Sequence, residues 1–192
     1  MARTVEFDQH NAIEKALDVF WKKGYNGASM RDLTDAMQIN SSSLYNTIGD
    51  KHQLFTECIK HYTQKRRIFL EQRAAGAASA VKALEQFFND VAAVVIKDAH
   101  GCFAIKTAFE VSPNDHGIQG LLKEDNDFTH TFLCTLIKKA IKDGEMTDAN
   151  DADMLADYII STYTGWYELF LLYRNPIQIK KLADFMAKQL LK

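Results

Sequence analysis

The chain has 192 residues, of which 47% are hydrophobic and 25% are charged, and its formal net charge is -2 at pH 7. These values are ordinary for a globular protein and suggest one domain or two small ones. No apolar run long enough for a membrane helix and no secretory leader is visible, so we expect a cytoplasmic protein with no membrane partner. The three cysteines (Cys58, Cys102 and Cys134) have the spacing of neither a disulfide framework nor a metal site.

The sequence predicts an all-α fold, because only 2 prolines and 9 glycines interrupt it and no stretch shows strand-like alternation. The first helix is expected from Asp8 to Lys23, with Gly24 as its C-cap. Two short helices joined by a tight turn are expected between Ser29 and Lys51. Ser29 and Asp32 form a potential capping box at the start of this segment.

The second short helix is expected to have one inner and one outer face. Leu44 and Ile48 lie at helical spacing and predict the inner face. The outer face would carry hydroxyls, an amide and a phenol, which can bond base edges and phosphates. On spacing alone, a helix-turn-helix and an ordinary helical hairpin with a polar face fit equally well.

Two groups of residues resemble the TetR family of transcriptional regulators. Leu44-Tyr45, Gly49-Asp50-Lys51 and Leu54-Phe55 resemble its "LY..F..K..LF" signature, and residues 20–33 (FWKKGYNGASMRDL) resemble its "F...GY..TS...L" entry. The chain departs from the family at Gln38, where Gly is common, and at Ile48, where Phe is usual. These departures lie in the turn and on the inner face, so they are expected to alter packing but not the family assignment.

The resemblance implies a helix-turn-helix DNA-binding domain at residues 1–50, a connecting helix at 51–73, and a ligand-binding and dimerisation domain at 74–192. The DNA-binding candidates are Ser29, Arg31, Ser41, Ser42, Ser43, Tyr45, Asn46, Thr47 and Lys51. Residues 1–50 hold five Lys or Arg and seven Asp or Glu. Affinity for a double-stranded operator is therefore expected to rest on a few placed groups and not on a basic stripe.

Further helices are expected at residues 51–72, 79–97, 102–111, 115–143 and 152–173, and a last one begins at Asn175-Pro176. The helix at 152–173 is the most aromatic, and Gly165 in its middle suits a close approach of two helices. A core helix that tolerates a glycine is the alternative. The family pairs its last two long helices across a dimer interface, so the resemblance implies a homodimer.

Aromatic and polar residues of four C-terminal helices are candidates for a pocket that takes a small organic effector. They are Phe88, Phe103, Thr107, Phe128, Phe132, Tyr163, Trp166 and Tyr167. A core position is the alternative for each of them. Cys102, at the start of a short helix, is a candidate redox or electrophile sensor because a helix N-terminus favours the thiolate. Lys106, one turn on, is expected to add to this effect.

No catalytic motif, phosphate-binding glycine loop or zinc-type spacing is present, so neither an enzyme nor a cofactor nor a metal is expected. The interpretation is a homodimeric repressor that a small organic effector releases from its operator. A small helical enzyme, a small-molecule-binding protein and a protein–protein adaptor that ignores DNA are the alternatives.

Overall fold

The computed structural model describes residues 8–97, 101–110, 115–147 and 151–191. Within these ranges the chain forms nine helices and no strand, so the all-α prediction is confirmed. The helices are α1 (Gln9–Gly27), α2 (Met30–Met37), α3 (Ser41–Thr47), α4 (Lys51–Ala75), α5 (Ala80–Lys97), α6 (Phe103–Glu110), α7 (His116–Lys142), α8 (Ala152–Tyr173) and α9 (Pro176–Leu190). None of them is long and apolar enough to cross a membrane.

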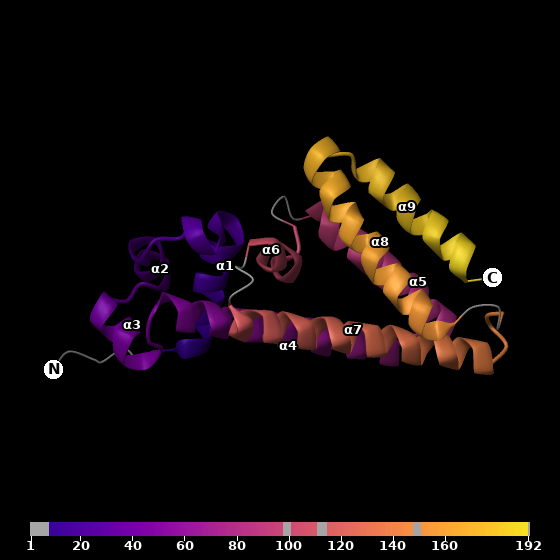
Figure 1. The fold of residues 1–192 in the computed structure, drawn as a ribbon, viewed down its shortest axis with the longest axis horizontal. Coiled ribbons are helices and arrows are strands. Elements are labelled where there is room, and N and C mark those ends of the chain that lie inside the picture. Colours follow the sequence, from indigo (N-terminus) through magenta and orange to yellow (C-terminus); the bar gives the residue numbers. More distant parts are fainter. Residues whose placement is uncertain (1–7, 98–100, 111–114, 148–150, 192) are drawn as a thin grey trace.

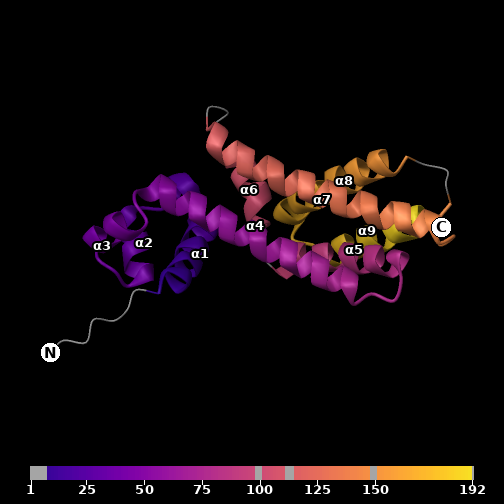
Figure 2. The same ribbon diagram turned by 90° about the horizontal axis from the view of Figure 1, so that it is seen from below.

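The molecule is elongated, with α1, α2 and α3 gathered at one end (Figure 1). The long helices α4 and α7 pass each other in its middle, and α5, α8 and α9 pack together at the far end (Figures 1 and 2). The α4 helix therefore reaches from the N-terminal group into the C-terminal group. Because α4 is one continuous helix, a movement of its C-terminal end would also move its N-terminus beside α3.

Two hydrophobic cores hold these groups together. The N-terminal core includes Phe20, Leu33, Leu44 and Phe55, each at most 2% exposed. The C-terminal core is built by α5, α7, α8 and α9 around side chains such as Trp166. Phe103 of α6 and Ile118 of α7 pack into the N-terminal core although they are distant in sequence. The two cores are thus joined through α6 and α7 as well as through α4.

The end of α1 differs from the expectation. Gly24 does break the regular helix, with φ +76°, but the chain makes a further turn and ends at Gly27. A Cβ added at Gly24 would lie 2.7 Å from the Glu110 carboxylate, which also accepts from the Asn26 amide at 2.9 Å. The left-handed backbone favours glycine here, and a larger residue would also displace the Glu110 carboxylate.

The other helix ends that the structure describes lie within three residues of their predicted positions. The α4 helix runs on to Ala75, α5 begins at Ala80, and α6 ends at Glu110. Val111, where the helix at 102–111 was predicted to end, lies outside the described residues, as do residues 98–100 and 112–114. Asp115 caps α7 by accepting from the Ile118 amide at 3.1 Å.

Candidate nucleic-acid interface and ligand cavity

The α2–α3 turn is made by a residue that the sequence analysis singled out. Gln38 has φ 58° and ψ 39°, which is the left-handed region where glycine is favoured. The turn therefore has a left-handed residue although its side chain is not that of a glycine. Asn40 then caps α3 by accepting from the Ser43 amide at 2.7 Å.

The α3 helix presents a polar face to solvent. Leu44 is fully buried in the N-terminal core, and Tyr45 is 55% exposed on the other side. Ser41, Ser42, Asn46 and Thr47 are also exposed, whereas Ser43 is half-buried.

Two hydroxyls of α3 are engaged within the helix. The Ser42 hydroxyl donates to the Asn40 side-chain oxygen at 2.7 Å. The Thr47 hydroxyl donates to the Ser43 carbonyl at 2.7 Å. Ser41, Tyr45 and Asn46 are thus the exposed α3 side chains whose polar groups are not engaged within the helix or its cap.

The remaining candidates flank α3. Lys51 begins α4, and its Nζ lies 4.6 Å from the centre of the Tyr25 ring, which holds the ammonium beside the helix N-terminus. The Arg31 side chain is 90% exposed and its Nε lies 3.6 Å from the Asp35 carboxylate. Ser29 is occupied as the N-cap of α2, because its hydroxyl accepts from the Asp32 amide and donates to the Asp32 carboxylate.

Lys51→Ala and Asn46→Ala are expected to weaken DNA binding in different ways. A lysine that holds a phosphate contributes to every sequence, so Lys51→Ala should lower all affinities alike and reduce the salt slope by about one. Asn46→Ala should instead relax the preference at one base pair, at a cost of roughly 1–3 kcal/mol. Fluorescence anisotropy against single-base operator variants at several salt concentrations separates the two. Unchanged binding by both variants would leave α2–α3 as a plain hairpin.

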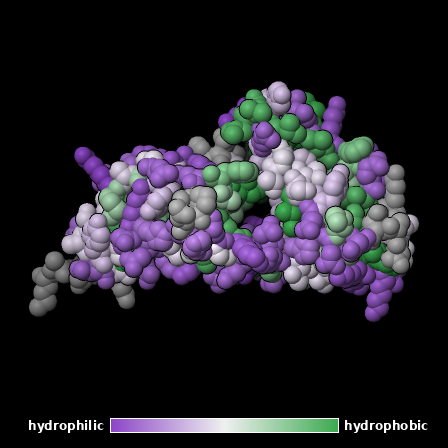
Figure 3. Space-filling view, viewed as in Figure 1, coloured by the Kyte–Doolittle hydropathy of each residue, from purple (hydrophilic) through white to green (hydrophobic). Residues whose placement is uncertain are grey.

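A cavity of about 810 Å³ lies between the two cores. Figure 3 shows the molecule hollowed between α6 and the α8 side, with hydrophobic side chains in the walls. The lining includes Leu17 and Trp21 from α1, and Tyr62 and Arg66 from α4. The remaining lining residues come from α4 to α8 and are Lys65, Phe69, Leu70, Phe87, Asp90, Val91, Val94, Cys102, Ala104, Ile105, Ala108, Gln119, Leu122, Lys123, Asp125, Asn126, Ile160, Tyr163, Thr164 and Tyr167.

Of the eight predicted pocket residues, Tyr163 and Tyr167 line this cavity. The structure does not bring the other six to its wall. Phe88 and Trp166 are buried in the C-terminal core, and Phe128 and Phe132 pack against it. Phe103 lies in the N-terminal core. Thr107 is buried on α6 at 1% exposure. Helical spacing identifies the inner face of a helix but does not distinguish a core position from a cavity wall.

One wall of the cavity carries a buried polar group of residues. Arg66 donates to the Thr129 hydroxyl at 2.6 Å and lies 3.4 Å from the Asp125 carboxylate. Arg67 lies 3.9 Å from the same carboxylate. Burial raises the pKa of Asp125, and the two guanidinium groups oppose that rise. The cavity therefore has a buried ion pair with hydrogen-bonding groups in one of its mostly apolar walls.

Sequence analysis missed Arg66, Asp125 and Tyr62 as site residues. Arg66 lies in the run Lys65-Arg66-Arg67, which has the composition of a solvated helix face. A usable signal was present, because Tyr62, Arg66 and Leu70 follow at intervals of four and so share one side of α4. That side faces the cavity.

Cys102 is 8% exposed and lines the cavity. Its Sγ lies 3.2 Å from the Tyr62 hydroxyl. Lys106 was expected to support a thiolate here, but its Nζ donates to the Trp21 carbonyl at 2.6 Å. The immediate partner of the sulfur is therefore a phenol and not an ammonium group.

Two segments of the sequence match known families. Residues 80–186 match the family described as "Tetracyclin repressor-like, C-terminal domain", and residues 12–58 match "Bacterial regulatory proteins, tetR family". The first match alone spans more than half of the chain. The chain belongs to the TetR family of transcriptional regulators.

Individual transcriptional regulators resemble most of the chain. The HTH-type transcriptional repressor ComR of Escherichia coli (strain K12) is 27% identical over 192 residues, covering 96% of this chain and 88% of ComR. The uncharacterized HTH-type transcriptional regulator YezE of Bacillus subtilis (strain 168) is 27% identical over 163 residues, covering 83% of this chain and 84% of YezE. A cysteine mutant of the TetR-family regulator CifR, solved with a 26-base-pair operator, superposes with a TM-score of 0.84 at 25% identity and covers 97% and 98% of the two chains.

The TetR assignment confirms the helix-turn-helix interpretation of α2 and α3. The protein is a DNA-binding transcriptional regulator and not an enzyme. The alternatives of a helical enzyme and of an adaptor without DNA binding are thereby set aside.

Proposed function

We propose that this protein is a homodimeric repressor, acting in the cytoplasm, that a small organic effector releases from a double-stranded operator. The observation that carries the proposal is the position of the cavity, which is lined by both α4 and α1. A ligand there touches the helix whose N-terminus follows α3. Such a ligand shifts DNA affinity only if it binds one arrangement of these helices more tightly than the other.

Three consecutive segments of the chain are proposed to have different roles. Residues 1–50 are proposed to bind DNA, residues 51–73 to connect, and residues 74–192 to bind the effector and dimerise. Phe103 and Ile118 support the coupling between these parts, because they belong to the C-terminal portion of the sequence and pack in the N-terminal core. A change at α6 or at the start of α7 therefore acts directly on the helices beneath α3.

The homodimer is supported by apolar side chains that remain exposed on α8 and α9. Twelve large hydrophobic residues are exposed in the described chain, and seven of them lie on α8 or α9. They are Met154, Tyr158, Leu171, Leu172, Tyr173, Ile177 and Phe185. Figure 3 shows hydrophobic side chains gathered at the top of the molecule, where α8 meets α9 in Figure 1. A second copy that covers this face would place two α3 helices on a two-fold operator.

The cavity also indicates the class of effector. Its walls are mostly apolar and aromatic, whereas Arg66 and Asp125 sit together on one side. This arrangement suits a molecule with a flat apolar body and a polar end that hydrogen-bonds to the Arg66 guanidinium or the Tyr163 hydroxyl. Burial raises the pKa of Tyr163 to about 12, so its hydroxyl keeps its proton and can donate.

An effector is expected to change Trp21 fluorescence and to lower operator affinity together. The Trp21 indole lines the cavity and donates to the Gly101 carbonyl at 2.7 Å, so occupancy alters its surroundings. Trp166 is 2% exposed in the C-terminal core, and a Trp21→Phe variant isolates its smaller response. Compounds that raise the melting temperature would be titrated against the protein–operator complex. A tight cavity ligand that leaves DNA affinity unchanged would indicate storage and contradict regulation.

We propose that covalent modification of Cys102 also releases the protein from its operator, because Cys102 lines the cavity. The thiolate adds to the carbon–carbon double bond of an electrophile such as a maleimide, so that a carbon–sulfur bond forms, the π bond breaks and the neighbouring carbon takes a proton from water. The bulky adduct then occupies the effector space. The other two thiols are poor competitors. Burial raises the pKa of Cys58 far above its ordinary value and raises the pKa of Cys134 to about 11.

N-ethylmaleimide is therefore expected to release the wild type from its operator, and also Cys58→Ser and Cys134→Ser, but not Cys102→Ser. Mass spectrometry of the released protein should show one adduct, on Cys102. Release of Cys102→Ser as readily as the wild type, or retention of the fully modified wild type, would make Cys102 structural.

A further inference from the structure

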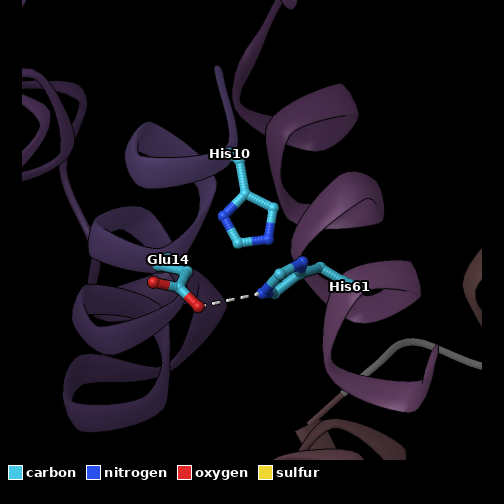
Figure 4. A group of neighbouring side chains, drawn as sticks. All are labelled: His10, Glu14 and His61. Atoms are coloured by element: carbon cyan, nitrogen blue, oxygen red, sulfur yellow. Dashed lines mark ion pairs between the residues drawn. The ribbon is translucent and has the colours of Figure 1, made fainter. Parts of the chain in front are cut away.

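Three side chains with metal-binding atoms converge between α1 and α4. His10 and Glu14 lie one turn apart on α1, and His61 faces them from α4 (Figure 4). One ligand atom from each residue can be chosen so that all three lie within 4.8 Å of one another. The two imidazole rings meet edge to face, with centroids 4.7 Å apart. Spacing of four residues on one helix plus a third group from a neighbouring helix is a common way to build a metal site.

His61 has a polar atom that the described part of the chain does not satisfy. Its side chain is 12% exposed, and its Nε2 is buried without a hydrogen bond. The Glu14 carboxylate lies 3.5 Å from this nitrogen. This separation is long for a hydrogen bond, so a closer partner between His61 and α1 would be stabilising.

Glu14 supplies an anionic ligand at the same place. A hydrogen bond from Lys65 at 2.7 Å, together with its charge, lowers the pKa of Glu14. The Lys65 side chain is 61% exposed and can turn into solvent. A metal ion in this position would replace the ammonium as the partner of the carboxylate.

We propose that His10, Glu14 and His61 bind one Zn²⁺ or similar divalent transition-metal ion, with water in the remaining position, and that this ion ties α1 to α4. Two imidazoles, one carboxylate and a water form a set that such metals accept in tetrahedral geometry. Two ligands of a tetrahedral zinc lie about 3.3 Å apart, so the side chains must close by an ångström or so. His10 and Glu14 are exposed and can rotate to do this.

A second cluster, His130, Cys134 and Asp153, offers a useful comparison. Its thiol is already engaged, because Cys134 Sγ donates to the Ala152 carbonyl at 3.5 Å and to the Asp153 carboxylate at 3.4 Å. Burial raises the pKa of that thiol to about 11, which opposes the thiolate that zinc binds. The cluster on α1 and α4 needs no such deprotonation, and the α7–α8 cluster serves as an internal control.

The test uses the untagged, metal-free full chain titrated with Zn²⁺ by calorimetry and with Co²⁺ by absorption spectroscopy. The wild type should bind one equivalent per chain and gain melting temperature as the ion is added. His10→Gln and Glu14→Gln, which replace exposed side chains, should melt like the wild type without metal. Each should weaken zinc binding by about tenfold or more, because even outer-shell changes cost that much.

The control variants are His130→Gln and Cys134→Ser, and both should bind zinc as the wild type does. The Co²⁺ complex should lack the intense sulfur-to-metal absorption that a cysteine ligand produces. Wild-type affinity in His10→Gln or Glu14→Gln, no zinc binding at micromolar concentrations, or a sulfur-to-cobalt band that Cys134→Ser abolishes would each overturn the proposal. Operator binding is not part of the readout, so the result stands apart from the proposed function.

Discussion

Gly165→Leu is expected to convert the dimer to a monomer and to abolish operator binding. A Cβ at Gly165 meets no heavy atom within 4 Å in the described chain, so the single subunit has room for a side chain. Helical spacing places Gly165 on the same face as Met154, Tyr158 and Leu172, which are 67%, 52% and 64% exposed. A leucine there would hold two paired helices apart. Analytical ultracentrifugation and a gel shift measure the two losses.

Gly120→Leu is the matched control. Gly120 lies in the helix α7, is exposed, and likewise shows no heavy atom within 4 Å of an added Cβ. Both changes replace a helical glycine with a better helix former, which favours each helix by roughly 0.5–1 kcal/mol. Gly120→Leu should remain a dimer that binds DNA. A dimeric Gly165→Leu, or a wild type that is monomeric at micromolar concentration, would rule out dimerisation through this face of α8.

Arg66→Met is expected to lower the free energy of unfolding by about 3 kcal/mol near neutral pH, as measured by urea denaturation. The change leaves the Asp125 carboxylate, whose side chain is 5% exposed, without its nearest cation. The lower end of the range for a broken buried ion pair applies, because the 3.4 Å separation is longer than that of an ideal charged hydrogen bond. Arg67, at 3.9 Å, compensates only in part.

The pH dependence has a definite sign. Burial already raises the pKa of Asp125 in the folded state, and loss of Arg66 would raise it further. A carboxyl whose folded pKa exceeds its unfolded pKa stabilises the fold at low pH and loses that contribution as the pH rises through the folded value. The deficit of Arg66→Met relative to the wild type should therefore shrink as the pH falls.

Two further variants check the cause of the Arg66→Met effect. Arg66→Met combined with Asp125→Asn should recover much of the lost stability, because the buried charge is gone. Arg73→Met breaks the exposed pair with Asp90, at 2.8 Å, and should cost far less, since water solvates the released carboxylate. Equal losses in Arg66→Met and Arg73→Met, or no recovery in the double variant, would show that the charge of Asp125 is not the cause.

Local signals in the sequence predicted the elements well. The Ser29–Asp32 capping box is formed as expected, and Asp50 and Gln53 form a second capping box at the start of α4. Leu44 is fully buried as the inner side of α3. These features depend on residues three or four apart, which a helix brings together by its own geometry. Helix starts and faces could therefore be derived before any tertiary contact was known.

The cavity could not be derived in the same way, because its walls come from six helices. Phe103 illustrates the difficulty, since its apolar helix face turned out to pack in the N-terminal core. Glu110 is another case, because its carboxylate accepts from the Asn26 amide 84 residues away. Such contacts depend on how α6 docks against α1, and no periodicity in either segment reports that.

A gel shift with the DNA that flanks the gene for this protein tests the central claim most directly, namely that a dimer binds a specific operator through α3. The wild type should form a discrete complex in which one dimer binds the two half-sites of the operator. This complex should persist in an excess of unrelated DNA. Asn46→Ala should weaken that complex more than it weakens binding to unrelated DNA. Equal competition by specific and unrelated DNA, or no complex at low salt, would contradict the account.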